Sequence, residues 1–229
     1  MNILAIGAHP DDLEIFAYGF LAAAAARGDN LVLGVATDGA AGGPNPGAEL
    51  AATRAKETRI GLAGLGAPTH LDLPDGGLAG APDARKRITE FIRGNAPDLV
   101  ITHAPEDYHP DHRALSNYVC EAAGFICPVL FCDTLMGIGF TPNYYVDISE
   151  YFSAKQRAIM AHHSQDPARF VNAAAITNRF RAAQCNAPDG QFAEAYRVDN
   201  RFPFLDIRAL LPPPPPYRPF YIPGSDALI

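Results

Sequence analysis

The chain has 229 residues, of which 48% are hydrophobic and 19% are charged, proportions typical of a globular protein rather than a disordered one. This length accommodates one large α/β domain and is too short for two domains of comfortable size. The formal net charge is -7 at pH 7 and the pI is about 5.4, so no basic surface for nucleic acid is expected.

Strand and helix patterns alternate along the first half of the chain. In chain order, they predict a strand at Asn2–Gly7, a helix at Asp12–Arg27, a strand at Leu31–Ala36, a helix at Glu49–Leu62, a strand at Thr69–Leu73, a helix at Asp83–Arg93, a strand at Asp98–Thr102 and a helix at Asp111–Gly124. Gly28 ends the first of these helices. Such alternation indicates an α/β fold in which helices cover both faces of a mainly parallel sheet.

The pattern is less regular in the second half. Pro128–Cys132 and Tyr144–Ile148 predict strands, and Ile148–His163 is mostly helical. Pro212–Pro216 predicts a stiff polyproline II segment, which is either a packed or spacer tail or a ligand for a proline-binding module. The tail is favoured because no repeated PxxP array surrounds this segment.

Residues 39–47 form a loop with too many Gly and Pro residues to be regular. The loop lacks both GxGxxG and GxxxxGK[ST], and it does not lead directly into a helix with a lysine, so it is weak as a nucleotide signature. A flap over a substrate pocket fits the loop better. Thr37 and Asp38 end the preceding strand, so they lie at the carboxyl end of a strand of the predicted sheet and are candidates for a pocket there. A turn-forming Asp-Gly pair explains Asp38 equally well.

Two short histidine-rich segments follow predicted strands. His9-Pro10-Asp11-Asp12 comes after the first strand, and His109-Pro110-Asp111-His112 comes after the strand at Asp98–Thr102. Carboxyl ends of parallel strands form the crevice where ligands bind, so we expect both segments at one edge of the sheet. Two histidines and one carboxylate with an open position are typical of catalytic zinc or non-haem iron. The sequence therefore predicts a divalent metal site.

These segments also resemble a known family. Ala8–Glu14 (AHPDDLE) and His109–Arg113 (HPDHR) are similar to the two signature motifs of the PIG-L/LmbE-like zinc-dependent de-N-acetylases. Further similarities are Arg54-x-x-Glu57, His162-x-Ser164-Gln165, Phe180–Gln184 and Ala193–Tyr196. The resemblance extends to about residue 196, and we expect a single domain over residues 1–229 with a Pro-rich tail at 197–229. It implies a Rossmann-like three-layer sandwich.

The resemblance implies a role for each matching residue. His9, Asp12 and His112 would bind one Zn²⁺ ion per chain, or another divalent metal. Asp11 would be the general base, and His109 the general acid or oxyanion stabiliser, with Asp111 orienting or charging it. Arg54 corresponds to a position associated with substrate contact. Asp38 and His162 are further candidates for the substrate pocket, and Glu194 is a candidate for shaping it.

The expected activity is zinc-dependent hydrolysis of an N-acetyl group from an N-acetylated amino sugar or sugar conjugate. One alternative is an amidase of the same family that acts on a non-acetyl or non-sugar amide. Another, of a different class, is a Rossmann-like binding module without catalysis. The intact set of metal ligands together with the base Asp11 argues against that module.

Other features concern the pocket wall and the setting. Phe140, Tyr144 and Tyr145 either stack on a sugar ring or pack in the core, and His103 lines the pocket or has a structural role. The longest apolar stretch, Phe16–Ala26, is too short to cross a bilayer, and no signal peptide pattern is evident. The four cysteines have no CxxC spacing. We therefore expect a cytoplasmic protein with reduced thiols. Its expected partner is a small-molecule substrate. The sequence does not decide the oligomeric state, and a homo-oligomer is compatible with it.

Overall fold

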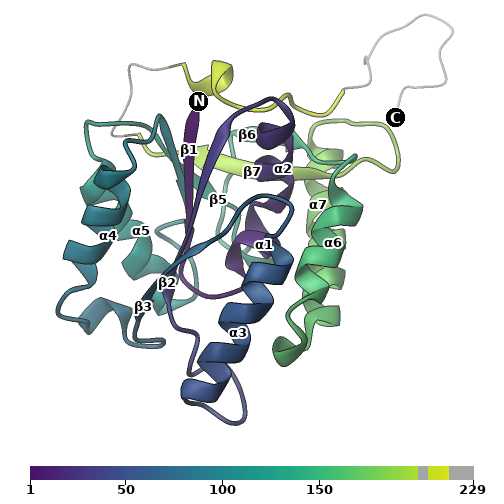
Figure 1. The fold of residues 1–229 in the computed structure, drawn as a ribbon. Coiled ribbons are helices and arrows are strands. Elements are labelled where there is room, and N and C mark those ends of the chain that lie inside the picture. Colours follow the sequence, from purple (N-terminus) through teal and green to yellow (C-terminus); the bar gives the residue numbers. More distant parts are fainter. Residues whose placement is uncertain (201–205, 217–229) are drawn as a thin grey trace, which may run out of the picture.

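The computed structural model describes residues 1–200 and 206–216, which surround one seven-stranded sheet (Figure 1). The strands are β1 (Asn2–Gly7), β2 (Asn30–Thr37), β3 (Thr69–Leu73), β4 (Leu99–Thr102), β5 (Val129–Cys132), β6 (Tyr144–Asp147) and β7 (Ala193–Val198). Their spatial order is β3-β2-β1-β4-β5-β7-β6. The first five pair in parallel, and β7 runs antiparallel to both of its neighbours. The predicted α/β fold with a mainly parallel sheet is confirmed.

Helices lie on both faces of the sheet and complete three layers. They are α1 (Asp12–Phe16), α2 (Tyr18–Ala26), α3 (Ala48–Gly61), α4 (Ala84–Gly94), α5 (Pro110–Ala123), α6 (Phe152–Met160) and α7 (Pro167–Gln184). Successive strand residues face opposite ways, so Leu4 and Ile6 pack with α4 and α5 while Ile3 and Ala5 pack with α1, α2 and α6. Both faces of β1 are therefore buried, which explains its uninterrupted apolar sequence.

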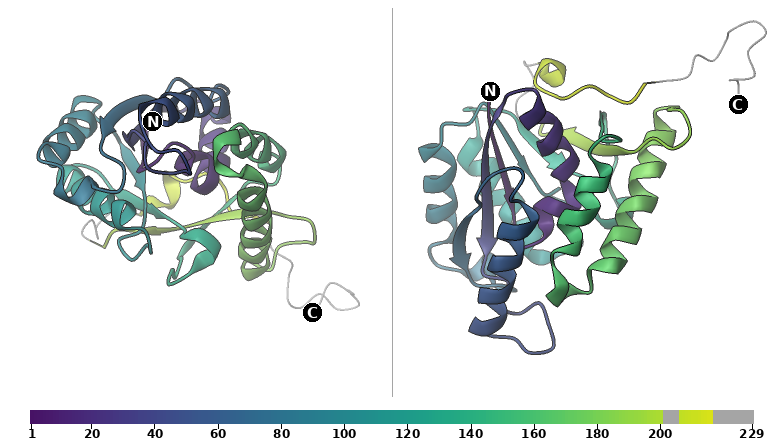
Figure 2. Two further views of the ribbon diagram at one scale, coloured as in Figure 1. Left: turned by 90° about the horizontal axis from the view of Figure 1, so that it is seen from below. Right: turned by 45° about the vertical axis from the view of Figure 1, so that its right-hand side comes forward.

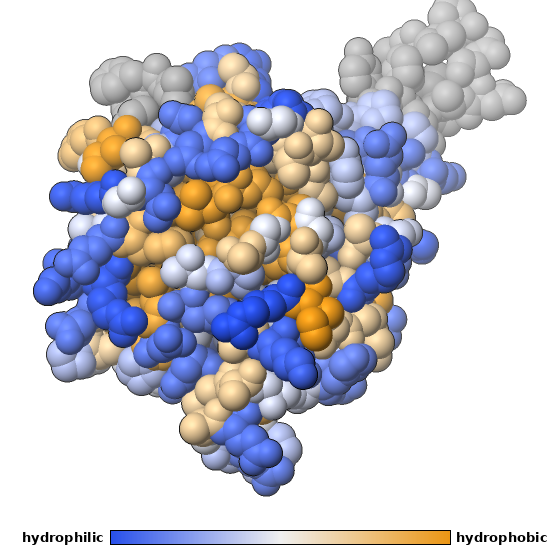
Figure 3. Space-filling model, viewed as in Figure 1, coloured by the Kyte–Doolittle hydropathy of each residue, from blue (hydrophilic) through white to orange (hydrophobic). Residues whose placement is uncertain are grey.

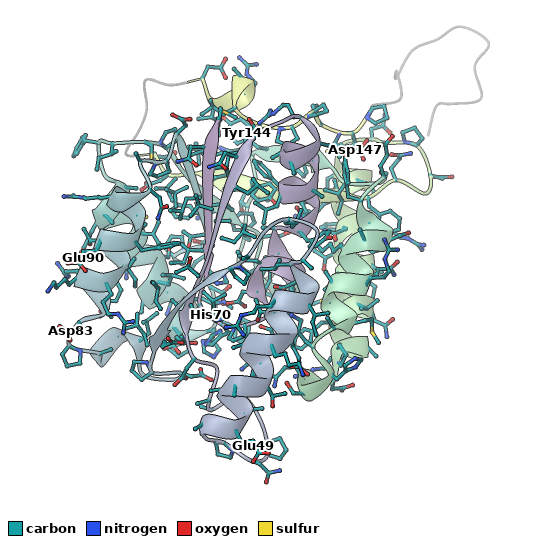
Figure 4. All side chains as sticks on the ribbon, viewed as in Figure 1. Glu49, His70, Asp83, Glu90, Tyr144 and Asp147 are labelled. Carbon is teal, nitrogen blue, oxygen red and sulfur yellow. The ribbon has the colours of Figure 1, made fainter. Side chains whose placement is uncertain are left out.

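The carboxyl ends of the parallel strands form the edge that carries both histidine segments. This edge is at the bottom of Figure 1, and the left-hand view of Figure 2 looks onto it from below. β1 and β4 are direct neighbours, with Ala5 paired to Ile101, so the segments that follow these strands emerge side by side. Glu49, in the first turn of α3, lies at the same end of the molecule (Figure 4).

The predicted helix at Asp12–Arg27 is two helices, so this prediction was wrong in one respect. Ala17 has φ -137° and ψ -1°, which interrupts the helix between α1 and α2. The Glu194 carboxylate accepts hydrogen bonds from the Gly19 and Phe20 amides at 2.9 and 2.7 Å. A buried carboxylate on β7 thus provides hydrogen-bond acceptors for the free amides at the start of α2. This contact joins residues far apart in the sequence, so the local sequence does not reveal it.

Two elements in the second half had no predicted counterpart. The 18-residue helix α7 contains many alanines and few large apolar side chains, so its apolar periodicity is weak. The strand β7 inserts between β5 and β6 and carries the charged Glu194 into the interior, where the side chain is 2% exposed. Its burial depends on partners from distant parts of the chain.

The described part of the proline segment packs against the edge of the sheet. Pro212 and Pro215 are buried, and the Pro213 carbonyl accepts a 2.9 Å hydrogen bond from the Asp147 amide at the end of β6. This arrangement favours the packed tail over a free recognition ligand.

Among the described residues, no helix has the length and apolar character needed to cross a membrane. The face shown in Figure 3 carries hydrophilic residues around apolar ones.

Candidate active site

The first histidine segment forms the turn between β1 and α1. Asp11 has φ 117°, in the left-handed region that a non-glycine residue rarely adopts, and such a conformation costs about 1–3 kcal/mol. The Arg54 guanidinium on α3 holds this turn: it donates to the Pro10 carbonyl at 2.7 Å and to the Asp11 carboxylate at 3.3 Å. Strain that the surrounding structure maintains is typical of a functional site.

Donor atoms of three residues meet where the two segments converge. His9 Nδ1 lies 3.2 Å from His112 Nε2 and 3.4 Å from an Asp12 carboxylate oxygen, and the other Asp12 oxygen lies 3.3 Å from His112 Nε2. Ligands bound tetrahedrally to Zn²⁺ at about 2.0–2.1 Å are roughly 3.4 Å apart. The spacing and the chemistry of these donors therefore fit a divalent cation.

Each histidine also faces carboxylates through its other ring nitrogen. His112 Nδ1 lies 3.2 Å from Asp107, while His9 Nε2 lies 3.2 Å from Asp75 and 3.4 Å from Asp111. Partners of this kind fix the orientation of a metal-binding imidazole and increase its basicity. The same side chains allow other groupings of three donors, namely His9 with His109 and His112, Asp12 with His103 and His112, and His9 with Asp75 and Asp111.

The carboxylates make this site favourable for positive charge. Burial opposes protonation of His112, but Asp12 and Asp107 raise its pKa to about 9. The pKa of His9 is also well above its usual value despite burial, because of Asp111, Asp12 and Asp75. Burial raises the pKa of Asp12, yet the charges of His112 and His103 outweigh it and hold that pKa well below the usual range.

Asp11 lies beside these donors in a different environment. Its side chain is buried, and burial raises its pKa to about 6 although the Arg54 charge acts in the opposite direction. A carboxyl group with a pKa near the operating pH is suited to general base catalysis. Burial thus gives Asp11 a pKa that suits a general base, and its role in the reaction stays a prediction.

His109 caps the N-terminus of α5. Its Nδ1 accepts a 3.2 Å hydrogen bond from the Asp111 backbone amide, which leaves Nε2 to carry the proton of the neutral ring. Burial, followed by the charges of His9 and His112, lowers the pKa of His109. The neutral ring can donate a hydrogen bond through Nε2.

The carboxylate of Asp111 bonds groups other than the His109 ring, which the sequence predicted it to orient. It accepts hydrogen bonds from the Gly76 and Leu78 amides at 2.7 and 3.1 Å and faces His9, whereas only its backbone amide bonds His109. The hydrogen bonds of this carboxylate thus orient His9 rather than His109, although its charge still raises the pKa of His109 against the larger effects that lower it. The reason is the approach of residues 76–78, which the motif itself does not reveal.

The cleft above these groups has a volume of about 170 Å³. Its lining consists of His9, Asp11, Asp12, Ile15, Phe16, Gly42, Arg54, Asp75, Tyr108, His109, His112, Leu135, Gln165 and Phe170. One wall is mainly polar, whereas the wall around Phe16, Leu135 and Phe170 is apolar. Gly42 brings the glycine-rich loop to the cleft, and the Ala41 amide ties that loop to Asp75 with a 2.9 Å hydrogen bond.

Not every predicted pocket residue reaches this cleft. Arg54 does, but His162 is 1% exposed, and its Nε2 lies 2.8 Å from the Glu14 carboxylate, so the imidazole is occupied in the interior. Asp38 accepts a hydrogen bond from the Ala40 amide, as in a turn, and does not line the cleft. Phe140 is buried in the cluster that contains Leu4 and Ile6, and Tyr144 packs against the separate cluster that contains Ile3 and Ala5.

Two carboxylates in the site were not predicted from the sequence. Asp75 follows β3 by two residues and Asp107 follows β4 by five, so both come from loops at the carboxyl edge. That placement is the signal that could have identified them. His103, directly after β4, stacks on His112 with ring centroids 3.7 Å apart and lies 3.0 Å from Asp12, which supports the structural role.

Comparisons with known proteins connect this geometry to a family. Residues 4–123 match the PIG-L model, described as GlcNAc-PI de-N-acetylase. The diacetylchitobiose deacetylase of Thermococcus kodakarensis is 32% identical over 188 residues, which cover 72% of this chain and 70% of that protein. The N,N'-diacetylchitobiose deacetylase structure from Pyrococcus horikoshii has a TM-score of 0.75 and 24% identity, covering 92% of this chain and 88% of that one.

A second solved structure is similar but carries a different activity in its name. The 4-carboxy-2-hydroxymuconate hydratase from Pseudomonas putida has a TM-score of 0.74 and 21% identity, over 86% of this chain and 95% of that one. At such identities the structural matches show a shared fold. The reaction must therefore be argued from the side chains in the cleft.

Proposed function

Because the chain belongs to the PIG-L family of GlcNAc-PI de-N-acetylases, we propose that it removes the N-acetyl group from an N-acetylated amino sugar or sugar conjugate, with one bound Zn²⁺ ion. The single observation that carries this proposal is the triangle of His9, Asp12 and His112 with the buried Asp11 beside it. The relatives named above as deacetylases of diacetylchitobiose support an acetylated sugar as the substrate.

His9, Asp12 and His112 would hold the ion, with Asp107, Asp75 and Asp111 keeping the two imidazoles in orientation. When bound, the ion polarises the amide carbonyl and lowers the pKa of water from ~15.7 toward ~7. This addresses the weak electrophilicity of an amide. The remaining requirements, proton transfer and stabilisation of charge, fall to other side chains of the cleft.

We propose that Asp11 accepts the proton of the attacking water and passes it to the amine nitrogen, which departs as the C–N bond of the amide breaks. Arg54 holds the turn that carries Asp11, so its proposed role is to position the base as well as to contact substrate. His109 would donate a hydrogen bond from Nε2 to the amide oxygen as that oxygen gains negative charge. Its bond to the Asp111 amide supports this role over that of a permanently charged acid.

The test is release of acetate from N,N'-diacetylchitobiose and from N-acetylglucosamine conjugates by the full chain. We expect activity in the zinc-loaded protein, its loss after chelation and its return when Zn²⁺ is added. The proposal fails if the chelated, metal-free protein retains full activity, or if none of these substrates releases acetate. Metal content measured on the same samples separates loss of the ion from loss of the fold.

A non-catalytic binding module is the alternative from another class. Such a module would need the metal-binding donor atoms or the cleft to bind its ligand. Binding alone would not require a strained, buried carboxylate next to the metal ligands. Asp11 has that character, with φ 117° and a pKa raised by burial. Binding of an N-acetylated sugar without any turnover would favour the module.

A further inference from the structure

A small cavity of about 30 Å³ lies behind the catalytic cleft. Ile15 and Phe16 on α1 and Leu135 after β5 line both the cavity and the cleft. The rest of the cavity wall comes from residues 133–136, from α6, from α7 and from β7. These three apolar side chains therefore separate two spaces, and we refer to Ile15, Phe16 and Leu135 as the gate.

The gate begins next to the proposed metal ligands. Ile15 and Phe16 follow Asp12 by three and four residues, so they share its side of α1 one turn further along the helix. The Phe16 ring centroid lies 6.0 Å from that of His112 and 5.6 Å from that of His103. A chain attached to a carbonyl at the metal site would thus meet the gate within a few bonds.

Burial distinguishes the two directions in which a substrate can extend. Toward solvent, Tyr108 is 59% exposed and Gly42 is exposed. Beyond the gate, the floor of the cavity is buried, with Lys155 1% and Glu194 2% exposed, whereas Met136 at the rim of the cavity is 46% exposed. An amino sugar is bulky and hydrated, so it fits only the open side, and the acyl group is left to face the gate.

The space beyond the gate is unsuitable for a hydrocarbon chain. A volume of about 10–15 Å³ is needed for a single water molecule, so the cavity is small. Its floor is polar: Lys155 donates to Glu194 at 2.6 Å, and Asn178 Oδ1 has no hydrogen-bond partner among the described residues. An alkyl chain there would cover polar groups without bonding them, which is unfavourable.

We propose that the gate formed by Ile15, Phe16 and Leu135 limits the acyl group to about the size of acetyl and excludes longer aliphatic acyl groups. This inference rests on the proposed hydrolysis of N-acylated amino sugars and specifies which residues select the acyl group. It assigns Leu135, in the loop after β5, a role in specificity. A methylene group that does not fit a pocket typically changes kcat/KM by about 10- to 200-fold.

The experiment compares N-acetyl-, N-propionyl- and N-butyrylglucosamine as substrates of the full chain. For the wild type we expect kcat/KM for the butyryl compound to be about 100-fold or more below that for the acetyl compound. Leu135→Ala removes three carbon atoms from the gate itself, so the extra carbons of the butyryl group can occupy the space left there without entering the polar cavity, and we expect the discrimination to fall by about 10-fold or more. The ratio of substrates is informative even if the substitution lowers overall activity. Leu135 suits the test because it is only half-buried.

Two further variants make the test specific. Phe170 lines the cleft but not the cavity, so Phe170→Ala removes an apolar wall without opening the gate, and the wild-type ratio is expected. Ala173 lines only the cavity, so Ala173→Leu added to Leu135→Ala refills the space and is expected to restore the discrimination.

The outcomes separate this inference from the proposed function. Hydrolysis of all three compounds at similar kcat/KM by the wild type would overturn the gate while leaving the amidohydrolase intact. The same ratio in Leu135→Ala as in Phe170→Ala would also overturn it. Absence of hydrolysis for every compound, and for N,N'-diacetylchitobiose measured beside them, would contradict the proposed function itself, and the gate with it.

Discussion

Individual side chains in the cleft divide into those that would bind the ion and those that would move protons. Asp11 and Asp12 are adjacent in sequence but have opposite surroundings. Asp12 faces His9, His103 and His112, which favour its charged form. Asp11 is buried, which raises its pKa, and the charge of Arg54 is the largest of the effects that oppose this rise. One carboxylate is therefore suited to a cation and the other to a proton.

Asp11→Asn tests this division. The amide keeps the shape of the side chain but cannot accept the proton, so we expect kcat to fall by about 10²- to 10⁴-fold while bound metal is retained. Turnover and metal content are measured together. Asp72→Asn is a matched control, since Asp72 is exposed and has a positive φ that asparagine also tolerates. Full activity in Asp11→Asn would remove Asp11 from the mechanism.

Asp107→Asn tests the contribution of the carboxylate behind His112. Asparagine can still accept the 2.9 Å hydrogen bond from the His109 amide, but it no longer offers a charge to His112 Nδ1. We expect Zn²⁺ affinity to fall by about 10- to 100-fold, as measured by competition with a chelator. Unchanged affinity would show that Asp107 only caps the loop.

At the scale of elements, the position of α1 depends on contacts from distant segments. Glu194 on β7 binds the start of α2, Lys155 on α6 and the Tyr196 hydroxyl, so a single carboxylate joins three elements behind the site. Glu14 on α1 pairs with His162, and Glu57 on α3 accepts from Ser164. The pair of Glu14 and His162 anchors α1, the short helix that carries Asp12, and the other bonds hold the elements around it.

Glu194→Gln removes one charge of a buried pair. Lys155 would keep an ammonium that is 1% exposed and has lost its counter-charge, and breaking such a pair costs about 3–5 kcal/mol. We expect a decrease of this order in the free energy of unfolding, measured with urea. Lys155→Met combined with Glu194→Gln should recover part of it because no unpaired charge remains. A double variant less stable than Glu194→Gln would contradict this explanation.

Gly61→Ala tests the close approach of α3 to α6. An alanine Cβ there would lie 2.7 Å from the Glu14 carboxylate and 3.0 Å from the Ala158 carbonyl. We expect a loss of about 1–3 kcal/mol in the free energy of unfolding. Gly64→Ala is the matched control, since its Cβ would meet only the Tyr18 hydroxyl at an ordinary 3.6 Å. Equal effects in the two variants would contradict the close-packing argument.

At the scale of the whole molecule, the site concentrates buried carboxylates at one edge of the sheet. Asp12, Asp75, Asp107 and Asp111 surround two histidines, and such a cluster favours a bound cation in the folded state. Metal binding should therefore stabilise the fold as a whole.

We also propose that the entire chain is one domain, because the described residues share a single sheet.

Removal of the ion is expected to lower the melting temperature. A ligand at 100 times its Kd stabilises the native state by about 2.7 kcal/mol, which corresponds to roughly 5–10 °C for a chain of this size. Thermal unfolding with a chelator and with added Zn²⁺ measures the difference. His112→Ala should show little response to Zn²⁺. Equal melting temperatures for the wild type under both conditions would argue against a bound ion.

Apart from the break at Ala17, short-range patterns were sufficient for the first two thirds of the fold. Apolar runs bounded by Gly, Pro and Asp predicted β1 and β3 with their observed ends, and the family assignment from the two histidine segments is confirmed. The break at Ala17, the helix α7 and the antiparallel strand β7 were not predictable in this way. Each depends on burial of a side chain against partners distant in sequence, Glu194 above all.

The sequence by itself determined the class of fold, the edge of the sheet at which the site forms and the residue types gathered there, because strand ends and motif spacing are local properties. Only the tertiary structure decided which side chains meet. It turned the Asp111 carboxylate toward His9, withdrew His162 into a pair with Glu14, and brought in Asp75 and Asp107 from separate loops. Orientation and burial arise from packing between distant segments, and they set the pKa values and hydrogen bonds on which the proposed chemistry depends.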